Sequence, residues 1–261
     1  MIFYFSATGN TLWVARQICE ATSDRLVPMT TGHADVEVTL AEGECLGFCF
    51  PVHGWRPPEL VRRFVRRLLI RSAKSPYVYA VCTAGDTVGE ALDIFRADLA
   101  RQGLRLVAEG SLLMPESYVG LPFMDVDTPQ REQEKIEASR QRLQGIIADI
   151  QRRLPIASPV DVGRWPRINS RLLGSVFHHC IVGDAAFSVQ ADRCVRCGRC
   201  AQVCPVADIA CEKGQLPRWR HNRQCMSCFS CYHHCPAHAI SYGWRTKGKG
   251  QYYLGHRAQK Q

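Results

Sequence analysis

The chain has 261 residues, of which 46% are hydrophobic and 22% charged, and a formal net charge of +9. This length suits one or two domains, and the composition is that of a globular protein. No apolar run approaches the roughly 18 residues of a membrane span, and Met1–Phe5 lacks the basic region of a signal peptide, so we expect neither.

Strand and helix signals alternate through residues 1–154, which predicts a parallel sheet covered by helices. Short apolar runs predict five strands, at Met1–Phe5, Arg25–Met29, Cys45–Phe50, Tyr77–Cys82 and Leu104–Met114. Apolar residues at helical spacing predict four helices, at Thr11–Thr22, Pro58–Ile70, Val88–Gln102 and Gln130–Leu154. We therefore expect residues 1–154 to form one α/β domain.

The remainder divides into three parts. Prolines and a glycine between Pro155 and Pro166 indicate a linker, and we expect residues 155–190 to link and pack between the two halves. A cysteine-rich module is expected at 191–244, and a basic, solvated tail at 245–261. Residues 1–160 carry 18 Lys and Arg against 19 Asp and Glu, whereas residues 161–261 carry 15 against 5. This excess charge favours an acidic redox partner; nucleic acid or anionic lipid is the less favoured alternative for the tail.

A polar loop follows the first predicted strand and leads directly into a helix. It reads Ser6-Ala7-Thr8-Gly9-Asn10-Thr11. Hydroxyl, amide and backbone N–H donors at a helix N-terminus can hold a phosphate group. An ordinary helix cap is the alternative, although a cap needs only one such residue. The loop lacks the Gly-Lys-Ser/Thr end of a P-loop and the glycine pattern of a dinucleotide fold, so ATP and NAD are disfavoured.

The most specific motif is a cysteine run that occurs twice, with the spacing C-x2-C-x2-C-x3-C and then proline. This spacing is typical of bacterial 4Fe–4S ferredoxins, in which the fourth cysteine of each run binds the other cluster. Zinc sites and a disulfide knot are the alternatives, and zinc usually takes two separated cysteine pairs. The predicted ligands are Cys194, Cys197, Cys200 and Cys235 for cluster 1, and Cys225, Cys228, Cys231 and Cys204 for cluster 2.

Six further cysteines lie outside the two runs, and their spacing suggests no disulfide framework. We therefore expect a reducing, cytoplasmic setting. Three of the six fall in predicted strands and are expected to be small core residues. The six are Cys19, Cys45, Cys49, Cys82, Cys180 and Cys211.

The loop Ser6–Thr11 resembles the flavodoxin phosphate loop, usually written S/T-x-T-G-N-T. Together with the cysteine runs, the chain resembles the EFR1-family ferrodoxins of anaerobic bacteria over nearly its whole length. Three other stretches match, at Phe50–Trp55, Cys82–Gly85 and Met114–Tyr118. The resemblance implies a flavodoxin-like sheet in the order 2-1-3-4-5, FMN at the carboxyl ends of its strands, and a small α+β two-cluster ferredoxin domain.

The resemblance also implies the FMN contacts. The phosphate would be held by Ser6, Thr8, Gly9, Asn10 and Thr11. The ring would contact Pro51, Val52, His53, Gly54, Trp55, Thr83, Ala84, Gly85, Asp86 and Tyr118. Trp55 is the candidate for stacking on the ring, with packing against a helix as the alternative. The loop after the fourth strand has no aromatic residue, so one ring face is expected to be open or covered by the ferredoxin module.

The expected function is electron transfer between FMN and two 4Fe–4S clusters, which couples one- and two-electron partners. The alternative is a flavin-dependent reductase of a small molecule, with His53, Asp86 and Tyr118 as weak catalytic candidates. A redox sensor that binds nucleic acid through its tail is the least favoured interpretation. The sequence does not indicate the oligomeric state.

Overall fold

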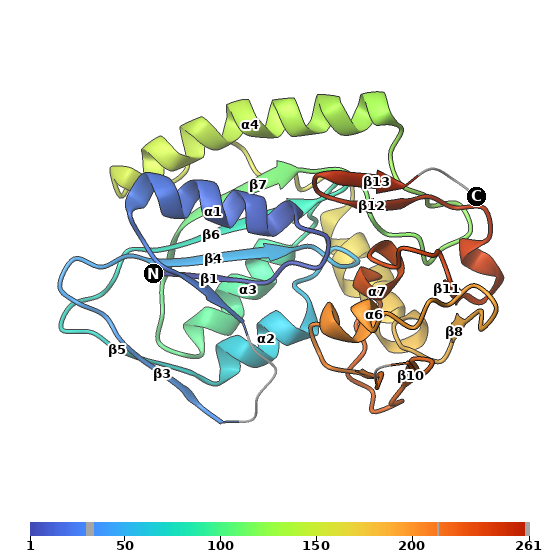
Figure 1. The fold of residues 1–261 in the computed structure, drawn as a ribbon. Coiled ribbons are helices and arrows are strands. Elements are labelled where there is room, and N and C mark those ends of the chain that lie inside the picture. The colour runs from blue at the N-terminus through green and yellow to red at the C-terminus, as the bar shows by residue number, and fades with distance from the viewer. Residues whose placement is uncertain (30–33, 213, 259–261) are drawn as a thin grey trace.

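In a computed structural model of the chain, residues 1–29, 34–212 and 214–258 are described. A five-stranded parallel sheet forms the centre, in the order β2-β1-β4-β6-β7 (Figure 1). Taken in chain order, these strands give the predicted order 2-1-3-4-5, which is that of flavodoxin-like folds. Their bounds are Ile2–Tyr4 (β1), Leu26–Pro28 (β2), Leu46–Pro51 (β4), Val78–Ala84 (β6) and Leu106–Leu113 (β7).

Helices cover both faces of this sheet, as Figure 1 shows. On one face, α1 (Asn10–Thr22) and α4 (Pro129–Gln151) pack on a core that contains Ile18 and Ile146. On the other, α2 (Glu59–Arg66) and α3 (Ala91–Ala100) pack on a second core. Strands buried on both faces must be apolar throughout, which explains the uninterrupted apolar runs in the sequence.

The prediction of a helix over Pro58–Ile70 is wrong in its last part. The helix ends at Arg66, and Leu68–Arg71 forms β5, which pairs in parallel with β3 (Val36–Thr39). β3 itself was not predicted. Leu68 keeps its place in the apolar stripe and is buried, so the helical spacing does not distinguish the two conformations. Pairing with a distant strand decides between them.

Residues 168–181 form one helical segment, here called the connecting helix. It consists of π-helical η1 (Ile168–Leu173), α5 (Gly174–Val176) and π-helical η2 (Phe177–Ile181). We expected this segment to pack between the two halves of the chain. Only one face of the connecting helix is buried in this way. Ser170 is fully buried, whereas Leu172 remains 61% exposed.

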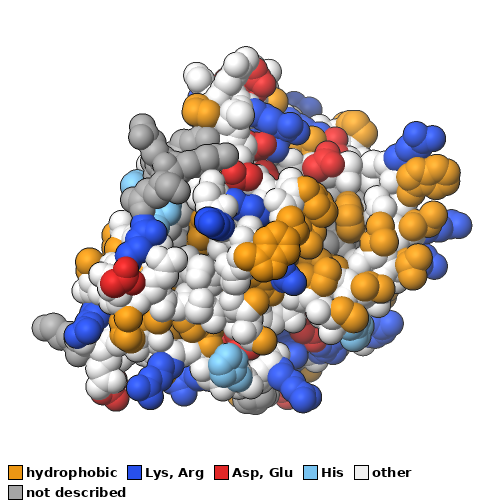
Figure 2. All heavy atoms as spheres, turned by 90° about the vertical axis from the view of Figure 1, so that its right-hand side faces the viewer, with side chains coloured by type: hydrophobic (Ala, Val, Ile, Leu, Met, Phe, Trp, Pro, Cys, Tyr) orange, Lys and Arg blue, Asp and Glu red, His pale blue; other side chains and the backbone are white. Residues whose placement is uncertain are grey.

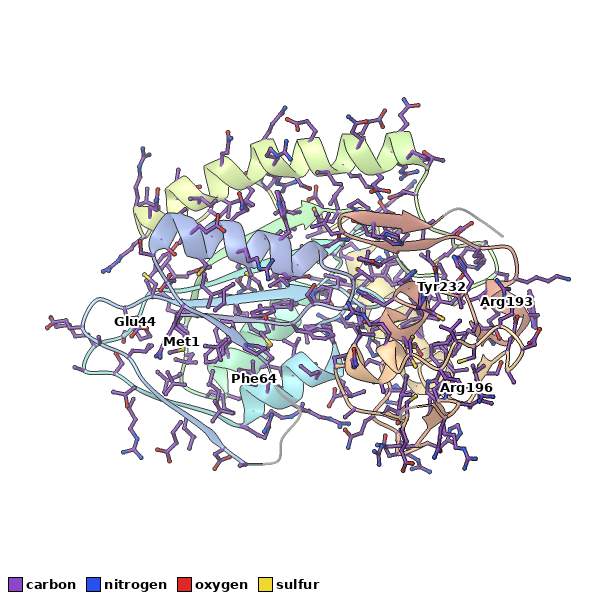
Figure 3. The ribbon with its side chains drawn as sticks, in the orientation of Figure 1. Met1, Glu44, Phe64, Arg193, Arg196 and Tyr232 are labelled. Carbon is purple, nitrogen blue, oxygen red and sulfur yellow. The ribbon has the colours of Figure 1, made fainter. Side chains whose placement is uncertain are left out.

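The cluster module packs beyond the carboxyl ends of the central strands (Figure 1). Its antiparallel pairs are β8 (Phe187–Val189) with β11 (Ile240–Tyr242) and β9 (Ile209–Ala210) with β10 (Arg218–Trp219). Two short helices, α6 (Arg199–Gln202) and α7 (Ser230–His233), carry the third cysteine of each run. In Figure 3, Arg193, Arg196 and Tyr232 lie in this module, and Met1 and Glu44 lie at the opposite end of the sheet.

The expectation of a solvated tail is wrong for residues 245–256. The chain turns through η3 (Gly243–Thr246) into a hairpin of β12 (Gln251–Tyr253) and β13 (His256–Ala258). Gln251 and Tyr252 are almost fully buried. The Lys249 ammonium group donates to the carbonyl oxygens of Val119 and Leu121, so burial and hydrogen bonding hold this basic segment in place. Residues 259–261 lie outside the described part.

Candidate functional site

The loop Ser6–Thr11 ends at the N-terminus of α1. Gly9 is the N-cap residue, with φ 94°, a left-handed conformation that glycine adopts without strain. No side chain caps the helix, and its first turn has no acidic residue. The first intrahelical bond runs from the Trp13 N–H to the Gly9 carbonyl, so the preceding N–H groups lack intrahelical acceptors. An uncapped end of this kind suits an anion.

Side chains of the loop reach the ends of two other strands. The hydroxyls of Thr11 and Thr83 lie 2.7 Å apart, and Thr8 donates to the Ser117 hydroxyl at 3.3 Å. The Asn10 amide donates to the Pro115 carbonyl at 3.0 Å. The structure therefore brings together the phosphate-loop residues, Thr83 and the segment after β7.

The cluster module and the C-terminal hairpin close over this loop. The Ser230 hydroxyl donates to the Ala7 carbonyl at 3.0 Å, and the Leu254 N–H donates to the Thr8 carbonyl at 2.8 Å. The Tyr252 hydroxyl lies 2.7 Å from the Asn10 side-chain oxygen. A Cβ atom on Gly9 would lie 3.1 Å from Leu254 Cβ, so the two segments are in close contact. Cover of the flavin ring by the module was one expectation, whereas cover of the phosphate loop was not predicted.

The loops after β4 and β6 contact each other directly. Val52 N–H donates to the Thr83 carbonyl at 2.8 Å, and the Trp55 indole N–H donates to the Thr87 hydroxyl at 3.0 Å. A Cβ atom on Gly89 would lie 2.8 Å from Trp55 Cβ, so this tryptophan also packs against Gly89. Stacking of Trp55 on a flavin stays a prediction.

Glu116 occupies the space beside Gly85. Its Oε1 accepts the N–H groups of Ser117 at 2.9 Å and Tyr118 at 2.7 Å, and burial raises the pKa of the carboxyl group. A Cβ atom on Gly85 would clash with Glu116 Oε2. Ala84 is buried in the core, and Asp86 is exposed.

Tyr118 lies between two aromatic rings. It makes edge contacts with Phe177 at 5.4 Å and Phe229 at 5.3 Å between ring centroids, so it joins the connecting helix to the cluster module. Burial raises the pKa of its phenol. His53 contacts the Phe5 ring, and its carbonyl oxygen accepts from His178 Nε2 at 2.9 Å. Burial lowers the pKa of His53 to about 3, so its ring is neutral.

These contacts test whether FMN suits the chain. The backbone N–H groups at the uncapped start of α1 suit a phosphate group, whereas the hydroxyls of Thr8 and Thr11 and the amide of Asn10 are bonded to other residues. The proposed ring contacts at Trp55, Gly85 and Tyr118 are already engaged with other residues of the protein. The phosphate contacts and the ring contacts of FMN therefore both stay predictions.

The two cysteine runs repeat the same backbone conformation. Positive φ angles occur at Arg196, Gly198 and Ala207, and again at the corresponding positions of the second run, which are Ser227, Phe229 and His238. The Asp208 N–H donates to Cys204 Sγ at 3.3 Å, and Ala239 N–H donates to Cys235 Sγ at the same distance. Hydrogen bonds to sulfur tune the potential of a cluster and orient its ligands.

The fourth cysteine of each run lies near the other run. The pKa of the Cys231 thiol is raised by burial and by the nearby Cys228, Cys225 and Cys204 thiolates. The pKa of Cys200 is raised by burial and then by Cys211, Cys235 and Cys197. Cys194, Cys197, Cys200 and Cys235 also line one cavity. This arrangement agrees with the predicted exchange of the fourth ligands, which stays a prediction.

Two residues that the sequence placed in or near the runs, His233 and Cys211, make contacts that it could not specify. Cys211 lies next to the first run, close to Cys194 and Cys197. His233 is buried, accepts the Tyr252 N–H on Nδ1 at 3.2 Å, and contacts the Ser117 carbonyl through Nε2 at 2.6 Å. The Nε2-protonated tautomer satisfies both contacts. The position of His233 inside the second run predicts a hydrogen-bonding role near a cluster, and its observed partners are the hairpin and the segment after β7.

Cys49 and Cys82 are fully buried in β4 and β6, as expected of core residues, whereas Cys45 precedes β4 and is only partly buried. Within the described ranges, no three His, Cys, Asp or Glu side chains converge to hold a single metal ion. In the same part of the chain, every helix is too short or too polar to cross a membrane.

Comparisons with known proteins agree with the module assignment. Residues 186–239 match the 4Fe-4S dicluster domain family. The chain therefore combines a flavodoxin-like fold with a segment that matches an iron–sulfur domain. A comparison with curated proteins gave no match.

Several solved structures resemble parts of the chain. A putative flavoprotein from Bacteroides uniformis is 19% identical, with 43% of this chain and 88% of that one covered and a TM-score of 0.35. A Streptococcus pneumoniae flavodoxin is 16% identical, with coverages of 55% and 95% and a TM-score of 0.32. The Trp repressor binding protein of Bacillus subtilis is 10% identical, with coverages of 60% and 98% and a TM-score of 0.33. Scores this low add nothing to the fold assignment, which rests on the strand order.

Proposed function

We propose that the chain is an electron-transfer protein that holds FMN at Ser6–Thr11 and two 4Fe–4S clusters on its cysteine runs, as the resemblance to EFR1-family ferrodoxins implies. One observation carries the proposal. The helix that bears Cys231 is hydrogen-bonded to the phosphate loop through Ser230 and Ala7. The predicted iron–sulfur and flavin sites therefore adjoin each other within one folded unit.

Bound FMN would exchange electrons singly or in pairs, and each cluster would exchange one. The protein residues would position and insulate these centres. The N–H groups at the start of α1 would bind the phosphate, and the N–H groups of Asp208 and Ala239 would stabilise the negative charge on Cys204 and Cys235. The buried rings of Phe229 and Tyr232 would exclude water beside the second run.

The first experiment is cofactor analysis of protein purified without oxygen. Iron, sulfide and acid-released flavin are assayed, and dithionite reduction is followed by absorbance and EPR. We expect one FMN and about eight iron atoms per chain, with EPR signals from two interacting clusters. Eight iron atoms without flavin would show that Ser6–Thr11 is not an FMN loop. Four or fewer would contradict the two-cluster assignment.

Variants assign each cofactor to its residues. Thr11→Val should lower flavin content and leave iron unchanged, and Thr22→Val, at the other end of the same helix, is the control. Cys204→Ser and Cys235→Ser should each disturb the cluster of the opposite run, with Cys180→Ser as an exposed control cysteine. If Cys204→Ser altered the signal of the first run instead, the exchanged ligand sets would be wrong.

A further inference from the structure

A cleft of about 550 Å³ opens between the flavodoxin-like part and the cluster module. One wall is α2 along its whole length with the loop before it, and a second is the end of the connecting helix. The third wall comes from Val206 and from residues 223–226, which lead into the second cysteine run. In Figure 1, α2 lies beside the cluster module. The volume is that of a site for a small organic molecule, and such sites are common between domains.

The cleft is strongly basic. Its lining contains one carboxylate, Glu59, and six arginines: Arg56, Arg62, Arg63, Arg66, Arg67 and Arg223. Glu59 accepts hydrogen bonds from both Arg63 and Arg66. Arg62 forms a two-point ion pair with the buried Asp98, at 2.6 and 3.0 Å. These two carboxylates neutralise only part of the charge, and a concave surface concentrates the remaining positive potential.

Two of the arginines have no carboxylate partner among the described residues. Arg56 donates through Nη1 to the Ser170 carbonyl at 2.8 Å, which fixes its guanidinium group and leaves its other donors for a ligand. Arg223 is exposed and comes from the cluster module, so it faces the cleft from another wall. A planar guanidinium group matches phosphate and carboxylate oxygens in pairs.

The rest of the lining is apolar or neutral. Leu60, Val206 and Met226 are buried apolar residues that form part of the surface. Burial lowers the pKa of His178, and its Nε2–H already donates to the His53 carbonyl, so Nδ1 remains as an acceptor. Cys225, the first cysteine of the second run, also lines the cleft. A ligand here would thus contact positive charge, apolar surface and a predicted cluster ligand at once.

We propose that this cleft binds a small organic polyanion that carries phosphate or carboxylate groups, beside the second predicted cluster. Arg56 and Arg223 would bind the anionic groups, and Leu60, Val206 and Met226 would contact the apolar part. No residue of Ser6–Thr11 lines the cleft, so it is separate from the phosphate loop, but it adjoins the predicted ring contacts because His53 is part of its lining. Its concave shape and its volume of about 550 Å³ favour a small molecule over the flat surface of a partner protein.

Calorimetric titration of the full chain, with its cofactors and at low salt, tests this proposal with two probes. Pyrophosphate represents phosphate ligands and citrate represents carboxylate ligands. Arg223→Glu and Arg56→Gln are compared with Arg218→Glu, an exposed arginine of β10 outside the cleft with the same change of charge. We expect one saturable site for at least one probe, weakened about tenfold or more by each cleft variant and less than about twofold by Arg218→Glu.

Three outcomes would overturn the proposal. One is the absence of saturable binding for both probes. Another is an equal loss of probe affinity in Arg218→Glu and Arg223→Glu, which would show that binding depends only on the net charge of the protein. The third is binding that Thr11→Val abolishes and Arg223→Glu leaves intact, which would place the anion at the phosphate loop. No electron transfer is measured, so this test and the test of the proposed function succeed or fail separately.

Discussion

At the scale of single residues, Glu116 organises the segment between the phosphate loop and the cluster module. Its carboxylate binds two consecutive backbone N–H groups, of Ser117 and Tyr118, and it lies directly against Gly85. Ser117 in turn contacts Thr8 and His233. A change at Gly85 is therefore transmitted to both predicted cofactor sites.

Gly85→Ala should destabilise the protein by about 1–3 kcal/mol, because the new methyl group displaces the Glu116 carboxylate from these N–H groups. It should also lower flavin content. Gly145→Ala is the control, since nothing lies within 4 Å of a Cβ atom at that helical position, and it should be neutral or stabilising. The midpoint of thermal unfolding checks both. An unchanged midpoint in Gly85→Ala would show that the Glu116 carboxylate can leave these N–H groups without loss of stability.

His53 should make stability depend on pH. Burial and the neighbouring His178 lower its pKa from 6.5 to about 3, so the unfolded chain takes up a proton first as the pH falls. The contribution of neutral His53 to the free energy of unfolding is complete above pH 6.5 and is lost as the pH falls toward 3. Because the side chain is only half-buried, we expect a loss of roughly 1–2 kcal/mol at about pH 5.

The measurement compares unfolding midpoints at about pH 7 and pH 5. His53→Gln should show a smaller drop than the parent protein, and His179→Gln, which changes an exposed neighbouring histidine, should keep the full drop. Equal drops in the parent and in His53→Gln would mean that His53 titrates alike in the folded and unfolded chains.

Local motifs could be predicted residue by residue, and side-chain partners could not. The loop Ser6–Thr11 and the cysteine runs are contiguous, so their chemistry is visible in the sequence. The bond between Trp55 and Thr87 joins two loops whose approach depends on the sheet order. The basic cleft was missed because the arginines of α2 have the spacing of an ordinary solvated helix face, and the cluster module that completes the cleft is distant in sequence.

At the scale of elements, strands inside the central sheet were predicted and elements at its margins were not. β4 and β6 are buried on both faces, so their composition alone indicates strand. β3 and β5 pair only with each other among the described strands. The apolar residues of α2 continue at helical spacing into β5, so the sequence predicts helix there. The C-terminal hairpin looked solvated because its lysine and arginine residues concealed the buried Gln251 and Tyr252.

His233 should hold this hairpin in place. His233→Phe keeps a ring of similar size but leaves the Tyr252 N–H and the Ser117 carbonyl without a partner, at a cost of about 2–4 kcal/mol. Hydrogen exchange of Gln251–Tyr253 should accelerate more than that of the central strands. His256→Phe, which changes an exposed ring stacked on Tyr253, is the control. Unchanged protection of β12 in His233→Phe would assign the anchoring to Lys249 and Tyr232 instead.

At the scale of the whole molecule, charge is separated along the chain. The excess of basic residues after residue 160 falls on the connecting helix, the cluster module and the hairpin. Figure 2 views the molecule from the module side and shows Lys and Arg side chains spread around hydrophobic patches. Such a surface attracts anionic partners and repels cationic ones at low salt.

Oxidation of the reduced protein by small cobalt(III) complexes tests this polarity. The rate constant for the anionic EDTA complex should fall, and that for the cationic hexaammine complex should rise, between about 0.05 and 0.5 M salt. Arg196→Glu, between the first two cysteines of the first run, should slow the reaction with the anion more than Arg140→Glu on α4. Rates that do not respond to salt would exclude steering by this surface.

The hydrogen bonds that join Ser230 and Leu254 to the phosphate loop imply an order of maturation. Both residues are translated after the flavodoxin-like part, so the nascent protein presents an open loop first and covers it later. Flavin would therefore load before the module closes, and release would require the module to loosen. Chains made under iron limitation would lose flavin as well, so the flavin content of a preparation would report how completely its clusters were built.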